Sequence, residues 1–199
     1  MKEGKSFKIT KREGFTAYKC VRANKAVGGM DGTDFEKYEK NLGNNLYKIW
    51  NRMPSGCYFT KDVKGGEIPK QNGKIRLLGI LTIEDRIAQM VVRNRIEPKI
   101  EPIFHNDFYG DRPNKSALDA IKSERENYFT IRWVIEFDIV GLFDKINHEK
   151  LLCAVKPHVS EKWIILYIER FLKVPIVMSD GSIIERESRI PQGGGLVQF

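Results

Sequence analysis

The sequence contains few cysteines and histidines, and both are scattered. Cys20, Cys57 and Cys153 are far apart and form no C-x-x-C pair, which is typical of free thiols in a reducing cytoplasm rather than of a disulfide framework. The three histidines are equally dispersed, so their spacing predicts no zinc site. No apolar run approaches the ~18 residues of a membrane span, and no signal-peptide pattern is present. We therefore expect a cytoplasmic protein without a membrane partner.

Charged residues are plentiful but unevenly distributed. Of the 199 residues, 30% are charged and 41% are hydrophobic, a globular composition with enough length for a substantial core. The net charge is +8, and positions 1–25 hold eight Lys or Arg against two Glu, which leaves +2 for the rest of the chain. A basic extension before a nearly neutral body favours contacts with a phosphate backbone. A solvated terminus without a partner has the same composition.

Hydrophobic periodicity predicts an α+β fold. A one-sided apolar stripe from 35 to 53 indicates a helix that ends at Pro54. Short strands are predicted at 57–63, 66–70 and 74–80, with Asn72-Gly73 as a hairpin turn. Further helices are predicted after Thr82 and over 116–130, 148–155 and 160–172, followed by a second hairpin at Asp180-Gly181. We expect an antiparallel sheet backed by these helices.

The most informative stretch begins at Trp133. Apolar, β-branched and aromatic residues over 133–139 predict a largely buried strand, with Asp138 near its C-terminal end. Gly141 then permits a tight turn into a short helical segment. A carboxylate at such a point suits Mg²⁺, which takes hard oxygen ligands and keeps positions open for phosphate. An aspartate that only caps the turn explains the same window.

Four motifs, in this order, resemble those of the reverse transcriptases encoded by bacterial group II introns. They are Ile68-Pro-Lys-Gln-Asn-Gly-Lys-Ile-Arg-Leu-Leu-Gly-Ile80 with Asp85-Arg-Ile-Ala-Gln89; Glu101-Pro-Ile-Phe104 with Tyr109-Gly-Asp-Arg-Pro-Asn-Lys-Ser-Ala-Leu-Asp-Ala120; Ile135-Glu-Phe-Asp-Ile-Val-Gly-Leu-Phe-Asp-Lys-Ile-Asn-His148; and Pro191-Gln-Gly-Gly194. The resemblance implies a basic N-terminal extension over residues 1–30, fingers over 31–130 and a partial palm over 131–199. It also implies a bacterial cytoplasmic protein.

The resemblance implies an RNA-directed DNA polymerase that extends a DNA primer on an RNA template with deoxynucleoside triphosphates. Such enzymes transfer the nucleotidyl group with the help of two Mg²⁺ ions. Asp138 would be the catalytic carboxylate and a metal ligand, and the carbonyl of Ile139 a second ligand. Lys70 and Arg76 match residues that contact the phosphates of the incoming nucleotide. Without the resemblance, ordinary exposed charges of a hairpin are the better interpretation of Lys70 and Arg76.

Four further positions match nucleotide-binding residues of the family. The backbone amides of Gly141 and Leu142 would meet phosphate oxygens. Phe143 matches the steric gate that excludes a 2′-hydroxyl, and Gln192 matches the glutamine that packs against the sugar. Simpler interpretations are core packing for Phe143 and a turn residue for Gln192.

The sequence contains no Tyr-Ala-Asp-Asp or similar motif, on which the family carries its remaining metal-binding carboxylates. We therefore expect an incomplete palm without catalytic hairpin or thumb, no polymerisation by the 199-residue polypeptide alone, and self-association through exposed palm surface. Gly195-Leu-Val-Gln-Phe199 departs from the family pattern, and our hypothesis is a frameshift just before Leu196. The alternative function is a catalytically dead RNA-binding module that retains the fingers and the basic extension.

Overall fold

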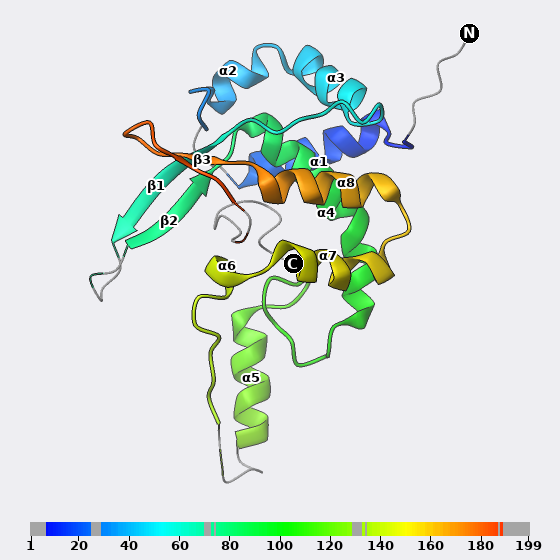
Figure 1. Ribbon diagram of the computed structural model, residues 1–199. Helices are drawn as coiled ribbons and strands as arrows, with labels where there is room; N and C mark the ends of the chain where they lie inside the picture. The colour runs from blue at the N-terminus through cyan, green and yellow to red at the C-terminus, as the bar shows by residue number, and fades with distance from the viewer. Residues whose placement is uncertain are drawn as a thin grey trace.

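The computed structural model describes residues 7–24, 29–69, 73, 75–128, 133, 135–186 and 188, and the side chains of residues 76, 128, 143 and 144 are not described. Within these ranges lie eight α-helices, two 3-10 helices and four strands (Figure 1). Their bounds are α1 Lys11–Ala23, α2 Phe35–Glu39, α3 Leu42–Arg52, β1 Val63–Pro69, β2 Ile75–Ile80, α4 Ile83–Ile100, η1 Glu101–Ile103, α5 Ala117–Tyr128, α6 Leu142–Lys145, α7 His148–Val155, η2 Lys156–His158, α8 Lys162–Lys173, β3 Ile176–Val177 and β4 Ile183–Ile184. None of the described helices is long and apolar enough to cross a membrane.

The four strands form one mixed sheet in the order β2-β1-β3-β4. Both predicted hairpins are confirmed, because β1 pairs antiparallel with β2, and β3 with β4. The two hairpins join in parallel, with Val63 opposite Ile176. The α+β class is confirmed, but the sheet is not wholly antiparallel, because β3 reaches β1 through a long helical connection and not through a tight turn. Gly65 allows the close approach, since a Cβ there would clash with Sδ of Met178.

The hydrophobic core lies between α1, α3, α4, α7 and α8. Ala17 of α1, Ile87 and Val92 of α4, and Ile164 and Tyr167 of α8 are completely buried. Figure 1 shows α4 crossing behind α8, so that one helix carries contacts to both the N-terminal and the C-terminal part of the chain. The predicted helices over 148–155 and 160–172 are confirmed, with the second shifted to Lys162–Lys173.

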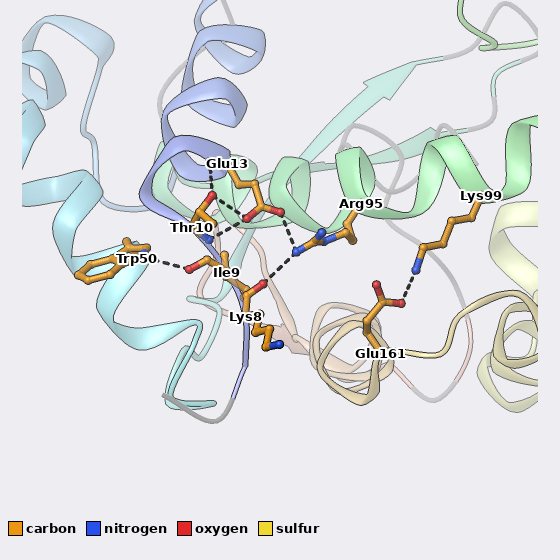
Figure 2. A network of polar contacts seen from close by, with 8 residues as sticks. All are labelled: Lys8, Ile9, Thr10, Glu13, Trp50, Arg95, Lys99 and Glu161. Carbon is orange, nitrogen blue, oxygen red and sulfur yellow. Dashed lines mark hydrogen bonds and ion pairs between the residues drawn. The ribbon is translucent and has the colours of Figure 1, made fainter. Parts of the chain in front are cut away.

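The start of α1 is fixed to the body by a polar network (Figure 2). Thr10 and Glu13 form a capping box, in which each side chain accepts a hydrogen bond from the backbone N–H of the other. The Glu13 carboxylate also pairs with Arg95 of α4 at 3.0 Å, and Nη2 of Arg95 donates to the carbonyl of Lys8 at 2.9 Å. Figure 2 also shows the Trp50–Ile9 bond and the Lys99–Glu161 pair. The basic extension is therefore anchored from residue 8 onward.

Two predicted elements differ from the structure. The single helix over 35–53 is two helices, because Asn41 has non-helical backbone angles between α2 and α3, and Asn45 Nδ2 donates to the carbonyl of Tyr38 across the break at 2.9 Å. Residues 57–62 form no strand, and β1 begins only at Val63. Apolar periodicity predicts the buried faces but not the breaks, since a local side-chain to backbone bond decides where a helix stops.

Candidate functional site

The β1–β2 hairpin was predicted to present Lys70 and Arg76 to a triphosphate. The hairpin is present, with six residue pairs from Lys64–Ile80 to Pro69–Ile75 and Gly73 at a φ of 75° in the turn region. Arg76 pairs with Ile68 through its backbone, but its side chain and the whole of Lys70 lie outside the described residues. The scaffold for the two cations is confirmed, and their role stays a prediction.

A buried polar knot, formed by Tyr58, Thr82 and Asp85, fixes the hairpin to α4. The Asp85 carboxylate accepts hydrogen bonds from the Tyr58 hydroxyl at 2.6 Å and from the Thr82 hydroxyl at 2.6 Å. The backbone N–H of Asp85 donates to Thr82 Oγ1 at 3.1 Å, which caps α4. Burial raises the pKa of Asp85, and the two hydroxyl donors oppose this rise. Burial also raises the pKa of Tyr58 well above its ordinary value.

The first turns of α4 carry two further polar side chains in or near the core. Gln89 is 4% exposed, and neither its Oε1 nor Nη1 of Arg86 has a hydrogen-bond partner among the described residues. Burial lowers the pKa of the Arg86 guanidinium, and Asp31 nearby opposes that shift. The sequence placed Asp85-Arg-Ile-Ala-Gln89 in a family motif, but only the structure shows that much of this motif is turned inward.

The loop between η1 and α5 is built around Arg112. Its side chain, 8% exposed, donates to Oε1 of Glu101 from Nε at 3.0 Å and from Nη2 at 2.8 Å. Nη1 donates to the carbonyls of His105 at 2.6 Å and Phe108 at 3.0 Å, and the guanidinium lies 5.4 Å from the centre of the Phe104 ring. The guanidinium group of one arginine thus holds together a loop that lacks regular secondary structure. Sequence reasoning quoted this motif without recognising that role.

The segment with Asp138 is the largest departure from expectation. Residues 133 and 135–139 form no strand, and Trp133, Ile135 and Phe137 are 85%, 85% and 87% exposed. The predicted buried strand is therefore wrong for this chain. A strand needs a neighbour to satisfy its backbone, and no strand among the described residues lies beside it. Asp138 and Ile139 are exposed, so neither residue is enclosed by apolar packing.

The turn after Asp138 is confirmed. Gly141 has a φ of 67° and a ψ of 36°, the left-handed region that glycine adopts without steric cost. It leads into α6, where Lys145 N–H donates to the Gly141 carbonyl at 3.0 Å. Leu142 is 42% exposed at the first position of α6. The Phe143 side chain and Gln192 lie outside the described residues, so the steric gate and the sugar contact stay predictions.

The described residues do not fit a complete two-metal site. No group of three His, Cys, Asp or Glu side chains within the described ranges could hold a metal ion. Asp138 is exposed, and two divalent ions need several carboxylate ligands.

Strand β2, Thr82 and Asp85 of the α4 knot, the Arg112 loop and the Asp138 turn all fall within one recognised region. A family model described as reverse transcriptase (RNA-dependent DNA polymerase) matches residues 68–197. The chain belongs to the reverse transcriptase family. Its resemblance to group II intron proteins is also confirmed, because the group II intron-encoded protein LtrA of Lactococcus lactis subsp. cremoris is 31% identical over 185 residues, or 90% of this chain and 30% of LtrA.

Two other relatives have similar coverage. Protein YkfC of Escherichia coli (strain K12) is 31% identical over 172 residues, which cover 83% of this chain and 45% of YkfC. A putative COX1/OXI3 intron 1 protein of Saccharomyces cerevisiae is 26% identical over 162 residues, which cover 81% of this chain and 19% of the yeast protein. This reverse transcriptase chain thus spans less than half the length of each of these relatives.

The fold is similar to a chain of a solved structure named as a partial Cas6-RT-Cas1--Cas2 complex. The TM-score is 0.59 at 20% sequence identity, over 93% of this chain and 30% of that chain. At this identity the likeness concerns the fold alone. Reverse transcriptases as a family act on nucleic acid and generally use a divalent metal for nucleotidyl transfer.

Proposed function

We propose that this chain forms the fingers and the first part of the palm of a group II intron-type reverse transcriptase. The complete enzyme would add deoxynucleotides to a DNA primer on an RNA template. The observation that carries the proposal is the match of residues 68–197 to the family, together with 31% identity to LtrA across 90% of this chain. We assign residues 1–30 to a basic extension, 31–130 to the fingers and 131–199 to the partial palm.

The hairpin supports a role in triphosphate binding. Six cross-strand pairs and the buried knot at Asp85 hold β1 and β2 rigidly against α4. A rigid frame reduces the entropy lost when Lys70 and Arg76 grip phosphate, Lys as a point charge and Arg as a planar fork. In the same proposal the amides of Gly141 and Leu142 meet phosphate oxygens, while Phe143 and Gln192 contact the sugar.

Asp138 is the proposed catalytic carboxylate. Its exposure and its position three residues before the Gly141 turn leave it accessible to a metal ion. With Mg²⁺ bound, Asp138 and the carbonyl of Ile139 would be protein ligands, and the remaining carboxylates would come from a hairpin that the sequence of this chain does not contain. For that reason the 199-residue polypeptide by itself should not extend a primer.

The basic extension supports an RNA partner. Lys8, Lys11 and Arg12 are exposed at the anchored start of α1, and Nζ of Lys11 lies 4.6 Å from the centre of the Trp50 ring. Cations next to aromatic rings suit a nucleic-acid backbone and its bases. The three free cysteines are all exposed, which supports a reducing cytoplasm as the location.

A second candidate is a catalytically dead RNA-binding module. It is favoured because no group of three His, Cys, Asp or Glu side chains among the described residues could hold a metal ion. Both candidates predict RNA binding that weakens steeply as salt rises. They differ in whether supplying the missing carboxylates restores primer extension.

The test is a primer-extension assay on this chain and on a fusion of it to the remaining palm and thumb of LtrA. We expect Mg²⁺-dependent extension by the fusion and none by the 199-residue chain. In the fusion, Asp138→Asn should lower the rate about 1,000-fold, because loss of a metal ligand removes several kcal/mol of transition-state stabilisation.

The matched control is Glu136→Gln, which removes a carboxylate from the same exposed segment, two residues away. It should change the rate less than about threefold, since a carboxylate outside the site adds little. Equal losses in the two variants, or a fusion that binds RNA with salt dependence but never extends a primer, would favour the RNA-binding module.

A further inference from the structure

The loop between α3 and β1 presents a phenylalanine to solvent. Phe59 is 70% exposed, whereas the residue before it, Tyr58, is 2% exposed. Residues 57–62 are all described, and they form no strand. One exposed apolar side chain is ordinary on a protein surface, so exposure alone assigns no role to Phe59. The contacts around its ring distinguish it from other exposed residues.

Arg170 of α8 holds this phenylalanine in place. Its guanidinium carbon lies 4.1 Å from the centre of the Phe59 ring, which is a cation–π contact. Nη1 of the same side chain donates to the carbonyl of Gly56 at 2.8 Å and to the carbonyl of Tyr58 at 2.6 Å. The Tyr58 hydroxyl in turn donates to the buried Asp85 carboxylate at 2.6 Å. A ring held on such a fixed backbone loses little conformational entropy when it binds a partner.

Arg170 also keeps N–H donors that no described residue uses. A guanidinium carries five such donors, and toward the described residues only Nη1 of Arg170 donates. Lys173, three residues further along α8, is exposed and lies on the same face of the helix. Neither cation pairs with a carboxylate of the described residues. Phe59, Arg170 and Lys173, here called the Phe59 surface, therefore combine a fixed aromatic ring with two cations that have no acidic partner there.

The composition of this surface favours a nucleic acid over an apolar partner. Residues 53–62 and 162–173 are all described, and Phe59 is the one large apolar side chain among them that is exposed. A membrane or an apolar helix needs a continuous patch and not one ring. The same two segments carry four Lys or Arg against two Asp or Glu. An exposed ring beside cations is the arrangement that binds single strands, since bases stack on the ring and the cations follow the phosphates.

The Phe59 surface is separate from the proposed triphosphate site. Phe59 stands four residues before the start of β1 at Val63, whereas Lys70 directly follows the other end of this strand at Pro69. The seven residues of β1 span roughly 20 Å. One nucleotide cannot reach from one end of the strand to the other, but a polynucleotide can. The Phe59 surface therefore fits part of a strand and not a second triphosphate.

We propose that the Phe59 surface binds a single-stranded nucleic acid, with one unpaired base stacked on the open face of the Phe59 ring and its phosphates beside Arg170 and Lys173. This inference rests on the proposed function, in which the complete enzyme binds an RNA template. It adds a contact that none of the predicted site residues supplies. Single strands of RNA and DNA share the chemistry of stacking and phosphate contact, so both are probes in the test.

The first test measures binding of the 199-residue chain to a labelled, unstructured RNA of about 12 nucleotides by fluorescence anisotropy. Phe59→Ala should raise the dissociation constant at least about fivefold, because stacking on the ring is lost. Phe59→Trp keeps a ring and should bind within about twofold of the wild type. The matched control is Phe108→Ala, which removes a phenylalanine that is 47% exposed in another loop and should leave the constant unchanged. Circular dichroism checks that each variant is folded.

Further probes define the ligand. The same RNA annealed to its complement has no unpaired base, so Phe59→Ala should change its binding by less than about twofold. A DNA strand of the same sequence shows whether the surface accepts both sugars: a fivefold loss for both assigns it to single strands in general, and a loss for RNA alone restricts it to RNA. Lys173→Gln should lower the slope of log K against log salt by about 0.7, because one phosphate contact is lost.

Photocrosslinking locates the contact directly. An RNA that carries 5-iodouridine in place of uridine should crosslink to the peptide that contains Phe59, because iodouracil reacts on irradiation with an aromatic ring on which it is stacked. Mass spectrometry of the digested complex identifies the peptide. Phe59→Ala should abolish this crosslink, and Phe59→Trp should retain it.

Three outcomes would overturn the proposal. One is RNA binding that Phe59→Ala leaves unchanged. Another is an equal loss in Phe59→Ala and Phe108→Ala, or an equal loss for single-stranded and double-stranded RNA. The third is binding of a polyglutamate peptide that needs Phe59 while RNA binding does not, which would assign the surface to an acidic protein segment.

The proposed function has a separate readout, primer extension by the LtrA fusion. A fusion that extends primers, together with RNA binding that is insensitive to Phe59→Ala, would reject the Phe59 surface alone. A fusion that never extends a primer, although the chain binds single strands through Phe59, would reject the proposed function alone.

Discussion

At the scale of single residues, the most consequential feature is a carboxylate buried where β2 runs into α4. Asp85 is 1% exposed and has no cationic partner at hydrogen-bond distance among the described residues; two neutral hydroxyls serve it instead. A buried charge is costly unless its hydrogen bonds are satisfied. This explains why an apolar stripe on α4 is interrupted by a polar residue at its first turn.

Tyr58→Phe should lower the free energy of unfolding by about 1–3 kcal/mol, because it removes one of the two hydroxyl donors to the Asp85 carboxylate and adds nothing in its place. Urea denaturation followed by circular dichroism measures the change. Tyr47→Phe removes a hydroxyl from a side chain that is 53% exposed and should cost less than about 0.5 kcal/mol. Equal costs would mean that the knot does not depend on the Tyr58 bond.

The same carboxylate predicts a pH dependence. Since burial raises the pKa of Asp85 above 3.8, the folded protein binds this proton more tightly than the unfolded chain. Its stabilising contribution is full below pH 3.8 and is lost as the pH rises through the folded pKa. The free energy of unfolding of the wild type, minus that of Asp85→Asn, should therefore fall with rising pH and then level off.

Urea titrations at several pH values between about 3.5 and 7 give this difference directly. Asp62→Asn makes the same change of charge at an exposed position and corrects for any general effect of net charge. A difference that stays flat for Asp85→Asn, or that rises with pH, would contradict the cause assigned to the shift.

At the scale of elements, backbone geometry decides where the chain turns. Gly141 adopts a φ of 67° before α6. Gly43, in contrast, is helical and exposed, and a methyl group added there would meet open space, with nothing within 4 Å of the ideal Cβ position. Replacement by alanine should therefore change stability in opposite directions at the two glycines.

Gly141→Ala should lower the free energy of unfolding by about 1–2 kcal/mol, because the Cβ of an L-residue is sterically strained in the left-handed region. Gly43→Ala should stabilise the protein by up to about 1 kcal/mol, since alanine loses less conformational entropy in a helix. Denaturant unfolding of the two variants in parallel measures the contrast. The same sign of change in both would contradict the left-handed turn at Gly141.

At the scale of the whole molecule, a packed body differs from an outer lobe, residues 101–147, in which no described residue is buried as a whole. The body contains α1, α3, α4 and α8 around one core and joins the two hairpins into one sheet. The outer lobe depends on local hydrogen bonds. Examples are the bonds from the Arg112 guanidinium to Glu101 and, at the start of α5, the bond that Ser116 Oγ donates to the Asp119 carboxylate at 2.5 Å. A segment held by local hydrogen bonds, without buried apolar area, unfolds locally at a low free-energy cost.

Amides of α5 and of residues 135–140 should therefore exchange with deuterium at least about 100-fold faster than those of α4 and α8. Hydrogen exchange read out by mass spectrometry resolves these peptides within one sample, so the body serves as the internal control. Protection of the outer lobe equal to that of α4 would contradict the division into body and lobe.

Sequence patterns predicted the parts of this protein that depend on near neighbours. The β1–β2 hairpin with Gly73 in its turn region, the second hairpin at Asp180-Gly181 and the turn at Gly141 follow from local backbone preferences and are present. The break between α2 and α3 was missed, because it depends on a side-chain bond from Asn45 that no periodicity reveals. The inward orientation of Asp85 and Gln89 was missed for a related reason: a polar residue on a helix indicates exposure until its partners are known.

The sequence by itself determined the family, because four motifs in fixed order need no coordinates to be recognised, and it determined the helices and hairpins whose hydrogen bonds close within a few residues. Only the tertiary structure decided that residues 133–139 lie open and that the two hairpins share one sheet. A strand becomes part of a sheet only when another segment, distant along the chain, supplies its hydrogen bonds and covers its apolar face. Here β1 has such a neighbour in β3, and the segment that carries Asp138 has none among the residues described.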